Sequence, residues 1–92
     1  MKVSIVIPAK NEELGLAILL PELVREYPDA EIIVVNDGST DNTGQICKEA
    51  GVIVVTHPYA KGNGAAVKSG ARVAKGDYLV FMDGDGQHKA AD

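Results

Sequence analysis

The sequence has little cysteine and no long apolar run, and each shortage excludes a class of protein. A single cysteine, Cys47, cannot form an internal disulfide, which fits a reducing compartment. No apolar run approaches the roughly 18 residues of a membrane span. Met1 and Lys2 lead directly into a predicted strand, without the apolar core of a signal peptide. We therefore expect a cytoplasmic protein, with membrane association only in a longer form.

Basic residues are also in the minority. Nine Lys and Arg residues stand against thirteen Asp and Glu residues, which gives a net charge of -4. Domains that bind nucleic acid normally carry a basic face, so no nucleic-acid partner is expected. Apolar residues make up 46% of the 92 residues, enough for the core of one small domain. Cys47 lies in a helical pattern with no histidine nearby in sequence, which argues against a nucleophile.

Short apolar runs alternate with helical patterns along the chain. The runs are rich in β-branched residues, as in buried strands, and apolar residues recur at helical spacing between them. The predicted strands are residues 3–7, 31–35, 52–56 and 78–82. This β-α-β-α-β-α-β order, with four strands and three helices, predicts an α/β fold with a Rossmann-like, mostly parallel sheet flanked by helices.

Local signals predict where these elements begin and end. Pro8 is expected to end the first strand, and Asn11 to cap a first helix that Pro21 should kink or divide. Gly51 is expected to end the second helix. The strand at 78–82 has the composition of a strand buried on both faces. If it ends the sheet, its apolar edge is unpaired, which predicts a homo-oligomer through this edge.

Polar clusters follow each predicted strand at the point where the strand ends. The clusters are residues 10–13, 36–41, 57–61 and 83–88. The carboxyl ends of parallel strands lie at one edge of an open sheet, and ligands bind there. The four clusters therefore predict a single site at that edge.

The last cluster contains two carboxylates one residue apart. Asp83 and Asp85 are followed by Gln87 and His88. Oxygen ligands on a glycine-containing turn suit a hard divalent cation, which would also relieve the repulsion between the carboxylates. An exposed turn rich in Asp and Gly is the alternative interpretation. An EF-hand is excluded, because its loop requires glycine where His88 stands.

The earlier clusters each allow two interpretations. Asp37 is either a turn residue or a charged acceptor for the N–H of a nucleobase. Glu12 either contributes to the same site or stabilises a helix dipole. His57 and His88 are expected to be exposed loop histidines; of the two, His88, beside the carboxylates, is the better candidate for a role in the site.

The glycines after the third strand do not form a dinucleotide fingerprint. Gly62 and Gly64 lack the third glycine of that motif. A helix that begins here still permits close approach of a phosphate, with Lys61 or Lys68 to supply charge. Tight packing of a helix on the sheet is the alternative.

Four segments together resemble the inverting family 2 glycosyltransferases, most closely the polyprenol-phosphate (dolichol-phosphate) mannosyl- and glucosyltransferases. These segments are residues 3–13, 34–41, 61–70 and 82–88. The resemblance implies that residues 1–92 form the nucleotide-sugar-binding, N-terminal half of a GT-A fold, without the acceptor half. It also implies transfer of a sugar from GDP-mannose or a UDP-sugar to a polyprenyl phosphate or related acceptor, with inversion and with a metal ion.

The resemblance further implies roles for individual residues. Asn36, Asn63 and Lys89 depart from the family pattern, which more often has Asp, Lys and Pro at these positions. Asp85 is assigned the catalytic role. Asp83, Asp85 and Gln87 are expected to hold Mg²⁺ or Mn²⁺ on the diphosphate. The residues expected to bind substrate are Pro8, Ala9, Asn11, Glu12, Asp37, Lys61, Lys68 and Asp83.

Two other functions are compatible with the sequence. The chain could be a nucleotide- or metal-binding module without catalysis. A sugar nucleotidyltransferase is disfavoured, because no glycine-rich loop of the Gly-x-Gly-Thr-Arg type follows the first strand.

Overall fold

The computed structural model describes residues 2–82, and its elements alternate as the sequence predicts. No helix in this part of the chain is long and apolar enough to cross a membrane. In chain order the elements are β1 (Val3–Ala9), α1 (Glu13–Glu26), β2 (Glu31–Asp37), α2 (Thr43–Ala50), β3 (Ile53–His57), α3 (Asn63–Val73) and β4 (Tyr78–Phe81).

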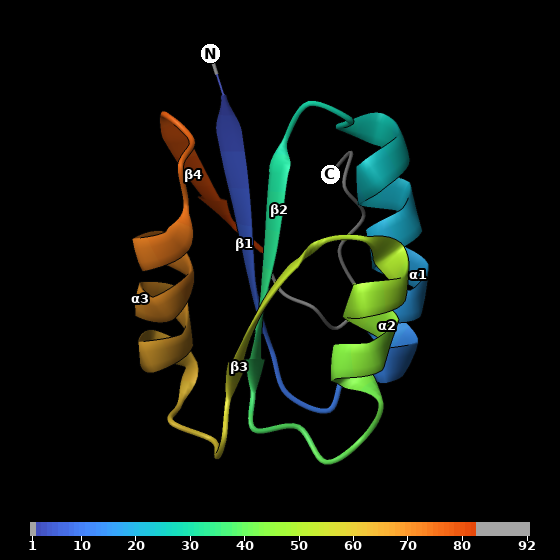
Figure 1. The fold of residues 1–92 in the computed structure, drawn as a ribbon, viewed down its shortest axis with the longest axis vertical. Coiled ribbons are helices and arrows are strands. Elements are labelled where there is room, and N and C mark those ends of the chain that lie inside the picture. The colour runs from blue at the N-terminus through green and yellow to red at the C-terminus, as the bar shows by residue number, and fades with distance from the viewer. Residues whose placement is uncertain (1, 83–92) are drawn as a thin grey trace.

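The strands form one parallel sheet in the order β3-β2-β1-β4. The predicted parallel sheet is confirmed. Figure 1 shows three layers, with α1 and α2 on one face of the sheet and α3 on the other. The loops that follow β1, β2 and β3 therefore lie at a common edge, as expected for parallel strands.

The face under α1 and α2 is filled by large aliphatic side chains. Four leucines of α1, at positions 16, 19, 20 and 23, recur at helical spacing, so they form one stripe that faces the sheet. Cys47 is fully buried here, and burial raises the pKa of its thiol to about 11, which agrees with a packing role. The buried residues of this face are Ile5, Ile7, Ala9, Leu16, Leu19, Leu20, Leu23, Ile32, Val34 and Cys47.

The face under α3 has a much smaller apolar core. Its buried members are Val6, Ile33, Val35 and Ala66. Gly70 lets α3 approach the strands closely, because a Cβ atom there would overlap Cγ1 of Val6 and lie 3.1 Å from Cγ2 of Val35. Small residues therefore bring the α3 backbone almost directly onto the sheet.

The expectation that Pro8 ends the first strand is wrong. β1 continues through Pro8, which pairs in register with Val35 of β2. On its other side, the described pairing of β1 with β4 covers residues 3–6 of β1, so Pro8 lies beyond it. A proline, which has no N–H to donate, is tolerated at such a position.

Pro21 is expected to kink or divide the first helix, and the expected division is wrong. α1 is continuous through Pro21. The proline removes the amide that would bond the carbonyl of Ala17, but both residues are exposed, so water can solvate that carbonyl. Leu20 and Leu23 pack on the sheet on either side, and this tertiary packing holds the helix together.

The prediction that the last strand is buried on both faces is wrong as well. The side chains of β4 range from 41% exposed at Val80 to 56% exposed at Tyr78. β4 is the edge strand of the described sheet and pairs only with β1. The strand residues of both core clusters come from β1, β2 and β3. The described helices therefore do not cover β4. Composition predicted the strand but not its place in the sheet.

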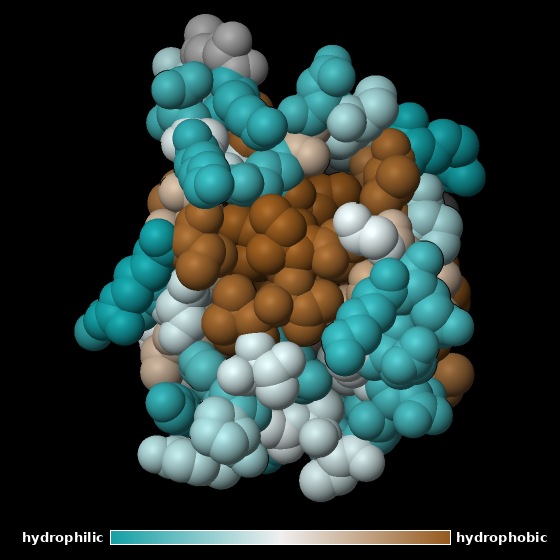
Figure 2. All heavy atoms as spheres, viewed as in Figure 1, coloured by the Kyte–Doolittle hydropathy of each residue, from teal (hydrophilic) through white to brown (hydrophobic). Residues whose placement is uncertain are grey.

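The opposite edge of the sheet also exposes apolar surface. Figure 2 shows a broad apolar area on the side of the molecule where β3 lies. Ile53, the first residue of β3, is 43% exposed. Both edges of the described sheet are therefore apolar.

Candidate functional site

The loops after β1 and β2 are joined by hydrogen bonds that centre on Asn11. Its Oδ1 accepts bonds from the amide of Thr40 at 2.7 Å and from the hydroxyl of the same residue at 3.2 Å. Its amide donates to Oγ of Ser39 at 3.0 Å. Asn11 has a φ of 52°, a left-handed conformation that asparagine tolerates. The expectation that Asn11 caps α1 is wrong, because its side chain bonds the neighbouring loop instead.

The amides at the start of α1 are bonded by the loop after β2 and by the first residue of α2. Glu12 occupies the N-cap position without a side-chain cap, and its amide donates to Oγ1 of the fully buried Thr43 at 3.0 Å. The amide of Glu13 donates to Oδ2 of Asp41 at 3.3 Å. These bonds satisfy helix-end donors that would otherwise lack partners. The two loops therefore form one polar unit.

Asp41 anchors the start of α2 in the same way. Its Oδ1 accepts a bond from the amide of Thr43 at 2.9 Å and another from the hydroxyl of Thr43. Burial raises the pKa of Asp41, but the hydrogen bonds from Thr43 and Glu13 outweigh burial and hold the pKa below its ordinary value of 3.8. Asp41 is therefore ionised at neutral pH.

Asp37 lies at the end of β2 and is only 6% exposed. Its Oδ1 accepts a bond from the amide of Lys61 at 2.9 Å and lies 2.8 Å from Nδ1 of His57, while Oδ2 accepts the amide of Gly62 at 3.0 Å. Burial raises the pKa of Asp37, but the bonds from Lys61, His57 and Gly62 hold it below 3.8. The site thus contains a buried, ionised carboxylate that shapes the loop before α3.

His57 is not the exposed loop histidine that the sequence predicts. It is the last residue of β3, is paired in register with Asp37, and is 6% exposed. Its Nε2 lies 2.8 Å from Oγ of Ser69 in α3. The alternation of β3 could have revealed this burial, because His57 shares a face with Val55, which packs in the α3 core.

The structure places the remaining predicted substrate residues in two groups. Pro8 and Ala9 end β1, beside the loop that contains Asn11 and Glu12, and so lie at the same edge as Asp37. The lysines are on the α3 side. The exposed Lys61 has its Nζ 5.4 Å from the centre of the Tyr59 ring, and Lys68 is exposed in the second turn of α3.

The predicted metal ligands Asp83, Asp85 and Gln87 lie outside the described residues, as does His88. Their metal-binding and catalytic roles stay predictions. β4 runs parallel to β1, so its carboxyl end points toward the edge that carries the polar loops. Within residues 2–82 there is no group of three or more His, Cys, Asp or Glu side chains that could hold a metal ion.

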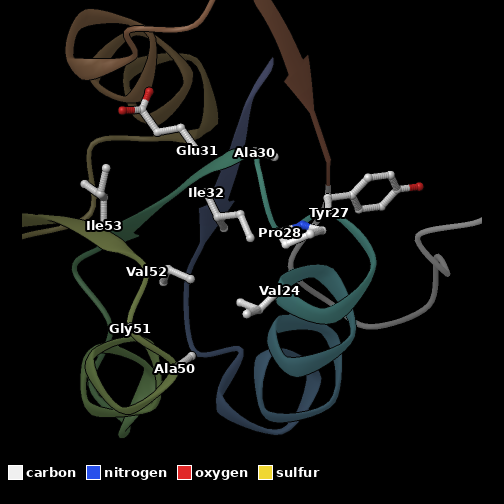
Figure 3. Close-up of a pocket in the computed structure, with 10 residues that line it drawn as sticks. All are labelled: Val24, Tyr27, Pro28, Ala30, Glu31, Ile32, Ala50, Gly51, Val52 and Ile53. Atoms are coloured by element: carbon white, nitrogen blue, oxygen red, sulfur yellow. The ribbon is translucent and has the colours of Figure 1, made fainter. Parts of the chain in front are cut away.

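A surface cavity of about 270 Å³ lies at the opposite end of the sheet. It is formed by the starts of β2 and β3 and by the ends of α1 and α2. Figure 3 shows Val24, Ile32 and Val52 pointing toward one another inside it, while the carboxylate of Glu31 points away. Because this cavity is at the amino ends of the strands, it is separate from the polar loops.

Comparisons with known proteins agree with this geometry. The family model for glycosyl transferase family 2 matches residues 4–92. A dolichyl-phosphate beta-glucosyltransferase of Trichomonas vaginalis is 36% identical over 104 residues, which cover 98% of this chain and 32% of that protein. The chain therefore spans about a third of the length of this relative.

Solved structures share the fold. TarS 1-349 of S. aureus matches with a TM-score of 0.85 at 29% identity, over 92% of this chain and 28% of that one. Glucosyl-3-phosphoglycerate synthase of Mycobacterium tuberculosis, solved in complex with Mn²⁺, UDP and glucosyl-3-phosphoglycerate, matches with a TM-score of 0.80 at 29% identity, over 90% of this chain and 33% of that one. The sheet and its helices thus have a GT-A, Rossmann-like arrangement, and the chain belongs to glycosyl transferase family 2, a family of enzymes.

Proposed function

We propose that the chain binds a UDP- or GDP-linked sugar at the carboxyl edge of its sheet. The observation that carries this proposal is the buried, ionised Asp37 at the end of the central strand β2. A fixed anionic acceptor suits the ring N–H that uracil and guanine share. The complex of the M. tuberculosis synthase with Mn²⁺ and UDP supports this class of ligand.

The neighbouring segments suit the rest of the donor. In this proposal a nucleoside lies beside Asp37 and contacts Pro8, Ala9, Asn11 and Glu12, which are at the end of β1 and in the loop that follows it. The start of α3 offers free backbone amides, and a Cβ atom at Gly64 would meet nothing within 4 Å, so a diphosphate can approach closely. Lys61 and Lys68 supply positive charge on this side.

The proposed metal ligands fit Mg²⁺ or Mn²⁺ by their chemistry. Asp83, Asp85 and Gln87 offer carboxylate and amide oxygens, which these cations prefer. These residues would hold a cation whose positive charge would offset the charge that develops on the departing nucleoside diphosphate. The catalytic role proposed for Asp85 is to hold the cation at that position.

The proposed reaction is transfer to a polyprenyl phosphate or a related acceptor. The dolichyl-phosphate beta-glucosyltransferase relative supports this acceptor class. A phosphate oxygen is already a nucleophile, so a general base is not required. One in-line displacement at the sugar carbon then inverts its configuration.

Calorimetric titration tests donor binding directly. UDP and GDP are titrated into the chain with and without Mn²⁺, and we expect Mn²⁺ to strengthen binding. Asp85→Asn should remove the Mn²⁺-dependent gain, while Asp29→Asn, at an exposed turn after α1, should leave it unchanged. A folded chain that binds no nucleotide rules out the proposal, and an unchanged Mn²⁺ effect in Asp85→Asn rules out the metal assignment.

Binding without transfer is a second candidate function. It is favoured by one observation, that the chain spans about a third of the length of its relative. The two candidates separate when labelled UDP-glucose or GDP-mannose is incubated with the chain, Mn²⁺ and a short polyprenyl phosphate. Lipid-linked label supports transfer; donor binding with no lipid-linked label supports a binding module.

We also propose that two copies of the chain associate through β4. The exposed apolar side chains of this edge strand, which within residues 2–82 pairs with β1 alone, support the proposal. Light scattering at high protein concentration should then report a dimer, and Val80→Lys should shift it toward the monomer. A monomer at all concentrations would contradict the proposed association through β4.

A further inference from the structure

His57 connects three elements of the fold. It ends β3, its Nδ1 lies 2.8 Å from Oδ1 of Asp37 in β2, and its Nε2 lies 2.8 Å from Oγ of Ser69 in α3. Its side chain is only 7% exposed. A buried imidazole bonded at both nitrogens has a fixed orientation, yet no role in the donor site has been assigned to it.

The direction of these bonds follows from the charge of Asp37. Because the pKa of Asp37 is held below 3.8, its carboxylate is ionised and can only accept. Nδ1 of His57 therefore carries the hydrogen. In the neutral ring Nε2 is then an acceptor, so the hydroxyl of Ser69 donates to it. With a neutral imidazole the bonds thus run from Ser69 through His57 to Asp37.

The carboxylate of Asp37 is nearly filled by these partners. An ionised carboxylate offers roughly four acceptor positions, two on each oxygen. His57 and the amide of Lys61 both bond Oδ1, while the amide of Gly62 bonds Oδ2. The remaining acceptor position is therefore on Oδ2.

We propose that His57 is a positioning residue that holds the carboxylate of Asp37 so that the free position on Oδ2 receives the ring N–H of a uracil or guanine base. This inference rests on the proposed donor binding. His57 does not touch the nucleotide; it fixes the rotation of Asp37, and Ser69 in turn fixes the imidazole.

Two matched substitutions test the role of His57. His57→Asn keeps an amide N–H close to the position of Nδ1, whereas His57→Gln places its amide near Nε2 and loses the bond to Asp37. Three ligands are titrated with Mn²⁺: UDP, whose base has an N–H at N3; CDP, whose base has a lone pair there; and pyrophosphate, which has no base.

We expect a loss that is selective for UDP. His57→Gln should weaken UDP binding by about tenfold, as for the loss of one hydrogen bond to a charged group, while His57→Asn stays within about threefold of the unsubstituted chain. CDP and pyrophosphate affinities should not change. Ser69→Ala keeps the imidazole and should weaken UDP binding by about threefold, again without changing pyrophosphate binding.

The outcomes distinguish the two proposals. If His57→Gln binds UDP as tightly as the unsubstituted chain, or loses pyrophosphate affinity equally, the positioning role is overturned while donor binding stands. If both His57 variants fail to fold, unchanged UDP affinity in Ser69→Ala overturns the role, and a UDP-selective loss supports it. If the unsubstituted chain binds no nucleotide, donor binding and the positioning role fail together.

Discussion

The two faces of the sheet are held by different kinds of interaction. Ten buried residues, including four of the five leucines of α1, fill the face under α1 and α2. Among the described residues, only four buried apolar side chains form the core under α3. Apolar burial therefore stabilises the first face much more than the second, at roughly 25 cal/mol per Å² of apolar surface.

The α3 face is instead secured at both ends by carboxylates of β2. Oε1 of Glu31 accepts hydrogen bonds from the amide of Lys75 and from the hydroxyl of Ser4, each at 2.8 Å. Oγ of Ser4 in turn accepts a hydrogen bond from the amide of Gly76 at 2.8 Å. Asp37 bonds the loop before α3 in the same manner. Charge-assisted hydrogen bonds thus supplement a thin core. The two faces should respond to different perturbations.

Truncating a buried leucine on the face under α1 and α2 should lower the stability of the protein most. Leu20 is fully buried, so Leu20→Ala leaves a cavity and should lower the free energy of unfolding by about 2–5 kcal/mol. Leu14→Ala, at a site that is 80% exposed on the same helix, should change it by less than about 0.5 kcal/mol. Urea unfolding measures both. Equal losses in the two variants would contradict the described packing of α1.

Adding one methyl group between α3 and the sheet should lower the free energy of unfolding, although the group is small. Gly70→Ala places a Cβ atom against Val6 and should cost about 1–3 kcal/mol through overpacking. Gly64→Ala on the same helix meets no atom within 4 Å, so it should be neutral or slightly stabilising. The comparison uses urea unfolding of the two variants, and a tolerated Gly70→Ala would argue against close contact of α3 with the sheet.

Acid should weaken the carboxylate anchors of α3. The amide of Lys75 and the hydroxyl of Ser4 hold the pKa of Glu31 below its ordinary value of 4.5. A carboxyl group whose pKa is lower in the folded state stabilises the fold above its unfolded pKa, and this contribution is lost as pH falls through the folded pKa. The free energy of unfolding should therefore decrease as pH falls below 4.5, and further below 3.8 as Asp37 is protonated.

Two variants separate this acid effect from a general loss of stability. Glu31→Gln should be less stable than the unsubstituted chain at neutral pH, and the difference should shrink in acid. The cost of Leu20→Ala should not depend on pH. Urea unfolding at several pH values between about 7 and 3 spans this window. If Glu31→Gln lowers the free energy of unfolding by the same amount at every pH, Glu31 does not anchor α3.

Substitution on the edge strand should have the smallest effect. Val80→Thr changes a side chain that is 41% exposed and lies outside both core clusters. Its free energy of unfolding at low protein concentration should stay within about 0.5 kcal/mol of the unsubstituted chain. A larger loss in urea unfolding would show that β4 is covered on at least one face.

The sequence predicted the alternation of elements because strand and helix patterns have different periods. It could not predict the strand order, since β1 and β4 pair across most of the chain, and so it misplaced β4 as a buried strand. It identified Asp37 as a site residue but missed its buried partner His57, because the prediction ended β3 one residue too early. The bond between Asn11 and Thr40 joins residues 29 positions apart, beyond any local pattern.

The two anchoring carboxylates restrict which insertions and deletions β2 can tolerate. Glu31 and Asp37 are the first and last residues of a seven-residue strand, and their even separation puts both on the α3 face. Inserting or deleting one residue between them would turn one carboxylate into the leucine-rich face, where it would have no donor. Inserting or deleting two residues would keep both carboxylates on the α3 face. The distance between them would then no longer match the length of the eleven-residue helix α3. We therefore expect natural length variation to occur in the loops of this fold and not in β2.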